Sequence, residues 1–163
     1  MFKFLKKKEA KPINENLYAV ASGKLIAISE VNDPVFSQKM MGDGFAVIPE
    51  NGDIYSPIIG QVISIFQTKH AVGLQMNNGL EILLHMGIDT VELKGAPFDI
   101  KVTEGDYVTQ ETLIAKVNLN AILAANKGTE MVVIITNMDQ LKKFELSKVG
   151  HVGAGELIGK AEA

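Results

Sequence analysis

The chain of 163 residues contains no cysteine and no arginine, and each absence excludes classes of site. Without cysteine there is no disulfide framework, no thiolate zinc site and no cysteine nucleophile, which fits a reducing compartment. All 16 basic residues are lysines, so the protein has no guanidinium fork for phosphate and is not expected to bind nucleic acid. No apolar run approaches the roughly 18 residues that a transmembrane helix needs.

Charge is unevenly distributed along the chain. The first eleven residues carry five lysines against Glu9, a net charge of +4, which leaves −7 on the rest because the total is −3. We expect residues 1–17 to be a basic, flexible tail and residues 18–163 to form a single domain, monomeric in solution. The apolar residues Phe2, Phe4 and Leu5 are too few for a secretory signal, which predicts a cytoplasmic protein. They would suit a weak contact between the tail and an anionic membrane surface.

From Tyr18 onward, short apolar runs are interrupted by Gly, Asn, Asp and Pro about every 8–12 residues, a spacing typical of an all-β sandwich or barrel. Helical segments are predicted only at residues 119–126 and 138–144. Strands are predicted at residues 24–28, 44–48, 60–66, 71–76, 81–86, 98–102, 113–117, 131–136 and 156–160.

Two pairs of segments resemble each other within the chain. Residues 104–114 and 149–158 both contain a Gly-bearing turn followed by an apolar strand, and residues 56–62 resemble residues 21–25. The predicted fold is therefore an antiparallel β-sandwich or barrel with a duplicated hairpin motif and few short helices.

Two histidines flank the strongest hairpin signal in the sequence, Asn78-Gly79. If these two residues form the turn, the residue numbers of each opposed pair in the two strands add up to 157. His70 and His85 then lie on one face of the sheet as diagonal neighbours, with their Cβ atoms about 7–8 Å apart. A three-residue loop would change the sum to 156 and place the two histidines on opposite faces. The predicted proximity therefore depends on the turn.

Such a pair has several chemical interpretations. The two histidines are either unrelated, or they form a metal site, an acid–base couple, or a nucleophilic imidazole assisted by its neighbour. Metal is the least favoured, because a catalytic zinc ion needs three protein ligands and the chain has no HxH or HExxH spacing. The third histidine, His151, lies in a Gly-rich turn and is expected to be exposed.

The residues around His85 follow a long and specific pattern: Gly79, three aliphatic residues at 82–84, His85, Gly87, Thr90 and Val91. This run resembles the phosphorylation site of the glucose-class enzyme IIA proteins of the bacterial phosphoenolpyruvate-dependent sugar phosphotransferase system. Residues 68–71 resemble the second histidine segment of that family, and residues 32–36 with 39–46 resemble a third. Together the similarity covers residues 18–160.

The resemblance implies a phosphocarrier, a protein-histidine phosphotransferase that needs no cofactor. Nε2 of His85 would accept a phosphoryl group from the carrier HPr and pass it to a cysteine on the IIB domain of a sugar permease. His70 would stabilise the phosphate, and the Thr68 hydroxyl would hold His70 in place. The resemblance is also compatible with regulation of other proteins, and with a zinc ion bound by His70, His85 and a carboxylate of a partner protein.

The resemblance further implies a docking surface around the two histidines. Asp33 and Asp89 would form an acidic rim that suits a partner with basic residues. The apolar floor or collar would consist of Val35, Phe36, Met41, Phe66 and Leu83.

Two other classes fit the fold pattern less well. A zinc peptidase of lysostaphin-like fold is the main alternative, but it needs a third ligand near His70 and His85. A biotinyl or lipoyl carrier needs a lysine at a hairpin tip, and none is found there.

Overall fold

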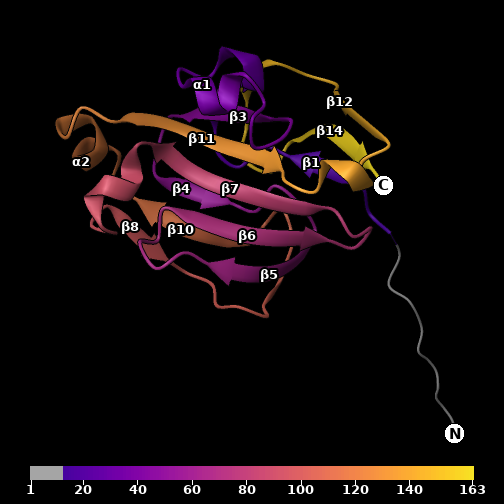
Figure 1. The fold of residues 1–163 in the computed structure, drawn as a ribbon. Helices are drawn as coiled ribbons and strands as arrows, with labels where there is room; N and C mark the ends of the chain where they lie inside the picture. The colour runs from indigo at the N-terminus through magenta and orange to yellow at the C-terminus, as the bar shows by residue number, and fades with distance from the viewer. Residues whose placement is uncertain (1–12) are drawn as a thin grey trace, which may run out of the picture.

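Three antiparallel sheets make up the protein, and the computed structural model describes residues 13–163 (Figure 1). The largest sheet has eight strands in the order β13 (Gly150–Val152), β2 (Gly23–Ala27), β3 (Gly44–Pro49), β11 (Gly128–Ile135), β7 (Glu81–Ile88), β6 (Ala71–Met76), β5 (Gly60–Ile65) and β9 (Tyr107–Val108). One small sheet has the order β1 (Asn16–Tyr18), β14 (Leu157–Glu162) and β12 (Lys143–Leu146). The other has the order β4 (Asp53–Tyr55), β10 (Leu113–Val117) and β8 (Phe98–Ile100).

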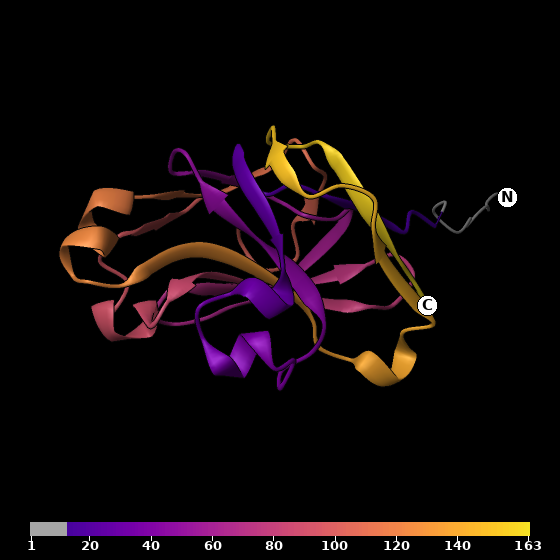
Figure 2. The ribbon, with the colours of Figure 1, turned by 90° about the horizontal axis from the view of Figure 1, so that it is seen from above.

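Within residues 13–163, helical structure is confined to short segments between the strands. They are α1 (Pro34–Ser37), α2 (Leu119–Ala124) and the 3₁₀ turns η1 (Ile28–Glu30), η2 (Thr90–Leu93) and η3 (Met138–Gln140). The predicted all-β architecture with few short helices is confirmed. In Figure 2, α2 and η2 lie at the end of the molecule opposite the C-terminus, where Lys127 forms an ion pair of 2.7 Å with Glu92.

The predicted helix at residues 138–144 is wrong beyond its first turn. The helical turn η3 ends at Gln140, and strand β12 follows from Lys143. In β12 the apolar Phe144 and Leu146 pack against the buried apolar core, whereas the alternating charged residues Lys143 and Glu145 are exposed, which is the pattern of a half-buried strand. Five strands of two to four residues were not predicted, because so few residues show no clear alternation: β1, β4, β9, β12 and β13.

The duplication proposed from the sequence is visible in the hydrogen bonding. The Tyr55 N–H donates to the Val20 carbonyl (2.7 Å), and the Tyr18 N–H donates to the Pro57 carbonyl (2.8 Å). Each bond becomes the other when residue numbers shift by 37, which is the offset between β2 and β5. The edge pair β13–β2 at one end of the large sheet corresponds to the edge pair β9–β5 at the other end. The half β13-β2-β3-β11 is therefore related to the half β9-β5-β6-β7 by an approximate two-fold axis between β11 and β7.

The two faces of the large sheet pack against different layers. The inner face joins the two small sheets in the main core, to which Leu74, Leu84 and Val133 contribute. On the outer face, η1 and α1 lie beside β3 and β11 (Figures 1 and 2) and cover a second, smaller core. This outer core consists of Ile26, Ile28, Val31, Phe36, Ala46, Ala71, Leu83, Ile88, Val132 and Ile134.

The start of the described chain bears on two expectations about the tail. Strand β1 begins at Asn16, so the predicted boundary at residue 18 coincides with the end of β1. The expectation of a flexible, membrane-contacting tail falls mainly on residues 1–12, outside the described residues. Among residues 13–163, no helix is long and apolar enough to cross a membrane.

Candidate functional site

The hairpin that carries His85 has a three-residue loop, so the two-residue turn assumed from Asn78-Gly79 is wrong. The Gly79 N–H donates to the Met76 carbonyl (3.0 Å), and Gly79 takes a left-handed φ of 95°. Opposed positions in β6 and β7 therefore sum to 156, with Ala71 facing His85. Strand alternation alone would then place His70 on the opposite face.

His70 nevertheless meets His85, because it lies outside the regular strand. It belongs to a turn between β5 and β6 in which the Lys69 N–H donates to the Phe66 carbonyl (2.8 Å) and Lys69 has a left-handed φ of 61°. Because His70 lies in this turn and β6 begins only at Ala71, its side chain does not follow the alternation of the strand. The two imidazole rings lie edge to face, with their centroids 5.0 Å apart. The predicted proximity is thus observed, for a different reason.

The tautomer of His85 follows from its backbone partner. Nδ1 lies 2.8 Å from the carbonyl oxygen of Gly87, which can only accept a hydrogen bond. The proton therefore sits on Nδ1, and Nε2 keeps a free lone pair. Burial lowers the pKa of His85 below its usual 6.5, and this effect outweighs the opposing effect of the Gly87 bond. His85 is thus a neutral imidazole at pH 7 with Nε2 available as a nucleophile.

His70 has a hydroxyl partner instead of a carbonyl. Oγ1 of Thr68 lies 2.7 Å from Nδ1 of His70, and a hydroxyl can either donate or accept there. When Thr68 donates, the His70 proton sits on Nε2, which makes that nitrogen a hydrogen-bond donor. Burial lowers the pKa of His70, so this ring is also neutral at pH 7.

Gly87 occupies a position that no side chain fits. Its φ is 90°, and a Cβ atom there would stand 2.4 Å from Cγ2 of Thr90 and 2.9 Å from the Gly128 carbonyl oxygen. Thr90 is itself fully buried and donates from Oγ1 to the Met86 carbonyl (2.7 Å). The sequence pattern contained Gly87 and Thr90, but it gave no sign that the Gly87 carbonyl sets the tautomer of His85.

Two aromatic rings support the imidazoles. Phe36 lies edge-on to His85 at 5.0 Å between centroids, and Phe66 lies edge-on to His70 at 5.5 Å. Of the apolar residues expected at the site, Phe36 and Leu83 are buried in the outer core. Val35, Met41 and Phe66 are about two-fifths exposed. Phe36 and Leu83 therefore form a buried apolar floor, and the ring of Phe66 beside His70 is partly exposed.

The two expected acidic residues act on His85 from different loops. Asp33 caps α1, with Oδ1 accepting a hydrogen bond from the Val35 N–H (2.8 Å). Asp89 is exposed and precedes η2 with a left-handed φ of 60°. Burial lowers the pKa of His85, whereas the negative charges of Asp33 and Asp89 act in the opposite direction. Both carboxylates therefore interact electrostatically with the His85 imidazole.

Other polar sites lie apart from the histidine pair. His151 is exposed on β13 as expected, 3.5 Å from Glu50. Within residues 13–163, no three His, Cys, Asp or Glu side chains are grouped so that they could hold a metal ion, so the zinc-peptidase alternative lacks a third ligand there.

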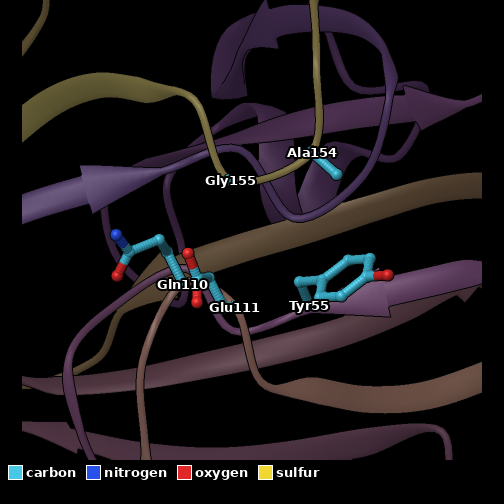
Figure 3. Close-up of a pocket in the computed structure, with 5 residues that line it drawn as sticks. All are labelled: Tyr55, Gln110, Glu111, Ala154 and Gly155. Carbon is cyan, nitrogen blue, oxygen red and sulfur yellow. The ribbon is translucent and has the colours of Figure 1, made fainter.

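A pocket of about 350 Å³ is also separate from the histidine pair (Figure 3). It lies between Tyr55 and two turns that belong to the repeated segments of the sequence. Its lining residues are Tyr55, Gln110, Glu111, Ala154 and Gly155. The pocket therefore lies where turns of two repeated segments meet, and neither His70 nor His85 lines it.

Known proteins are similar to this chain over most of its length. A family model described as phosphoenolpyruvate-dependent sugar phosphotransferase system, EIIA 1, matches residues 15–141. The glucose-specific EIIA component of Halalkalibacterium halodurans is 40% identical over 151 residues, which are 93% of this chain and 87% of that protein. The glucose-specific EIICBA component of Streptococcus pneumoniae is 49% identical over 152 residues, 93% of this chain but only 21% of that protein.

A solved structure has the same fold. The glucose permease IIA of Mycoplasma capricolum superposes with a TM-score of 0.80 at 34% sequence identity, covering 88% of this chain and 93% of that one. The chain therefore belongs to the EIIA 1 family of the phosphoenolpyruvate-dependent sugar phosphotransferase system and is a phosphocarrier of that system.

Proposed function

We propose that Nε2 of His85 accepts a phosphoryl group from a phosphohistidine of HPr and passes it to a cysteine on the IIB domain of a sugar permease. The observation that carries this proposal is the bond of 2.8 Å between Nδ1 of His85 and the Gly87 carbonyl, which leaves Nε2 as the nucleophile. A phosphorylated imidazole keeps a high transfer potential, whereas a serine ester would retain the phosphate. Nitrogen therefore suits a carrier that must give the group away again.

The transfer itself needs no further reactant. A P–N bond to Nε2 forms as the P–N bond to the HPr histidine breaks, and His85 keeps its Nδ1 proton. The onward step reverses this at Nε2 while the cysteine thiolate takes the phosphorus. Since phosphoryl transfer depends mainly on positioning and charge stabilisation, the chain's own side chains suffice for these steps.

His70 would stabilise the phosphoryl group during transfer. With Thr68 donating to Nδ1, the Nε2–H of His70 can donate to a phosphate oxygen next to His85. Preorganised donors of this kind contribute about 2.7–4 kcal/mol where they have been removed in other enzymes. Thr68 thus acts through His70 by selecting its donor tautomer.

Partner docking would use the collar and the acidic residues around the histidines. The exposed apolar residues Val35, Met41 and Phe66 offer contact area, and Asp33 and Asp89 attract basic side chains. We expect Asp89→Asn to raise the KM for phospho-HPr about two- to fivefold at low salt, because one attractive charge is lost. In 1 M salt, where the screening length is about 3 Å, the difference should disappear. An unchanged KM at low salt would exclude Asp89 from docking.

The relatives' names suggest the identity of the sugar system. Those of H. halodurans and S. pneumoniae are called glucose-specific, which supports a glucose permease as the owner of the IIB domain. A phosphocarrier that works between HPr and the inner side of a permease belongs in the cytoplasm. Regulation of other proteins through the same surface remains a further proposal.

The experiment is phosphorylation with radiolabelled phosphoenolpyruvate, enzyme I and HPr, followed by a test of acid lability. We expect acid-labile label on the wild type and on His70→Gln. The His70→Gln variant should still accept the phosphoryl group but transfer it more slowly to IIB. His85→Gln should carry no label. His151→Gln is the matched control, because His151 is exposed and remote, and it should behave as wild type. No label on folded wild type, or label on His85→Gln, would overturn the proposal.

A further inference from the structure

Thr90 is a polar side chain that is completely buried beside the reactive histidine segment. Its hydroxyl donates to the Met86 carbonyl at 2.7 Å. Its methyl group packs against Gly87, since a Cβ on Gly87 would stand 2.4 Å from Cγ2 of Thr90. Thr90 thus contacts both residues that follow His85 in the chain.

The orientation of the Gly87 carbonyl needs such contacts. Glycine is the least restricted residue, so its own torsion angles do not hold the carbonyl against Nδ1 of His85. Thr90 fixes the peptide that enters Gly87 through its hydrogen bond to the Met86 carbonyl. Thr90 and the Gly128 carbonyl also fill the space where a Cβ of residue 87 would stand, at 2.4 and 2.9 Å, and against these neighbours Gly87 keeps its left-handed φ of 90°.

We propose that Thr90 is a positioning residue for phosphoryl transfer, which holds the Gly87 carbonyl on Nδ1 of His85 and thereby keeps Nε2 free of its proton. The inference rests on the proposed role of His85 as phosphoryl acceptor. Because Thr90 is buried, its hydroxyl has no water to replace the Met86 carbonyl as a partner, so the contact persists.

The consequence for chemistry is a choice between two tautomers. With the Gly87 carbonyl in place, the proton stays on Nδ1 and the lone pair of Nε2 can attack phosphorus. Without it, the tautomer with the proton on Nε2 competes, and that form has no lone pair at the attacking nitrogen. After attack, the retained Nδ1 proton leaves the phosphorylated ring positively charged, which makes it a good leaving group for the next transfer.

Three variants separate the hydroxyl from the methyl group. Thr90→Val keeps the branched shape without the hydroxyl, Thr90→Ser keeps the hydroxyl without the methyl, and Thr90→Ala removes both without a clash. The tautomer of His85 is read from the ¹⁵N chemical shifts of its ring at a pH above its pKa. Label uptake from phospho-HPr is measured in parallel.

We expect wild type and Thr90→Ser to hold the proton on Nδ1 of His85 and to take up label at similar rates. Thr90→Val and Thr90→Ala should show mixed tautomers, with uptake about tenfold slower, since loss of one hydrogen bond corresponds to a factor of this order. Thr112→Val is the matched control. The Thr112 hydroxyl accepts from the Thr109 N–H (2.9 Å) in a distant turn, so its loss should affect stability but neither the tautomer nor uptake.

A Thr90→Val or Thr90→Ala protein with the wild-type tautomer and rate would overturn the proposal, even with a lower melting temperature. Loss of the tautomer in Thr90→Ser would also contradict it, since the hydroxyl is then not the cause. The tautomer is measured without phosphorylation. An unlabelled wild type with the proton on Nδ1 therefore counts against the acceptor role of His85 and not against the action of Thr90 on the tautomer.

Discussion

Gly87→Ala is the substitution whose cost follows most directly from the geometry. At a φ of 90°, an L-residue is strained by about 1–2 kcal/mol. The new Cβ would also stand 2.4 Å from Cγ2 of Thr90 and 2.9 Å from the Gly128 carbonyl, and such overpacking costs about 1–3 kcal/mol. The free energy of unfolding should therefore fall by about 2–5 kcal/mol.

Gly79→Ala provides the matched control. Gly79 has a similar φ of 95°, but a Cβ there would find nothing within 4 Å. Only the backbone strain applies, so we expect a loss of about 1–2 kcal/mol. The difference between the two variants, about 1–3 kcal/mol, isolates the crowding around Gly87.

Urea unfolding followed by circular dichroism measures both losses, and label uptake from phospho-HPr measures the functional effect. Relief of the clash must move the Gly87 backbone and its carbonyl away from Nδ1 of His85, so uptake should fall in Gly87→Ala and stay normal in Gly79→Ala. Equal losses of stability in the two variants would refute the packing argument. Normal uptake in folded Gly87→Ala would refute the role of the carbonyl.

Three further predictions concern pH and polar contacts. Burial lowers the pKa of His85 below 6.5, so the unfolded chain binds protons more strongly, and stability to urea should fall as the pH drops below about 6.5, with a shallower fall in His85→Gln. Asn78→Ala removes an amide that donates to Oε2 of Glu15 (2.9 Å), so the free energy of unfolding in urea should fall by about 1–3 kcal/mol. The control Asn77→Ala should lower it by about 0.5 kcal/mol at most. Thr68→Val should slow label transfer about tenfold by freeing the His70 tautomer, and Thr68→Ser should restore it; equal rates in both variants would exclude the hydroxyl.

The fold class could be predicted because turn residues interrupt the apolar runs at regular intervals. The ends of the longer strands follow from the same pattern, as at Ala71–Met76 and Leu113–Val117, where prediction and structure coincide. Short strands such as β1 and β9 could not be predicted, because two or three residues carry no period. Their pairing depends on partners elsewhere in the chain, since β1 pairs with β14 and β9 pairs with β5, which is a tertiary effect.

The histidine pair shows where reasoning from spacing reaches its limit. The three-residue loop makes alternation alone separate His70 from His85, yet their ring centroids lie 5.0 Å apart. The cause is the turn before β6 with its left-handed Lys69, a backbone conformation that a lysine side chain gives no reason to expect. Gly87 and Thr90 were recognised as parts of a pattern, but their physical role depends on a carbonyl direction that only coordinates provide.

The most direct test of the account is to locate the phosphorus atom on the phosphorylated protein. NMR of ¹⁵N-labelled protein resolves which ring nitrogen couples to ³¹P and which one retains its proton. We predict phosphorus on Nε2 of His85, with the proton kept on Nδ1 toward the Gly87 carbonyl. Phosphorus on Nδ1 of His85, or on His70, would contradict the account.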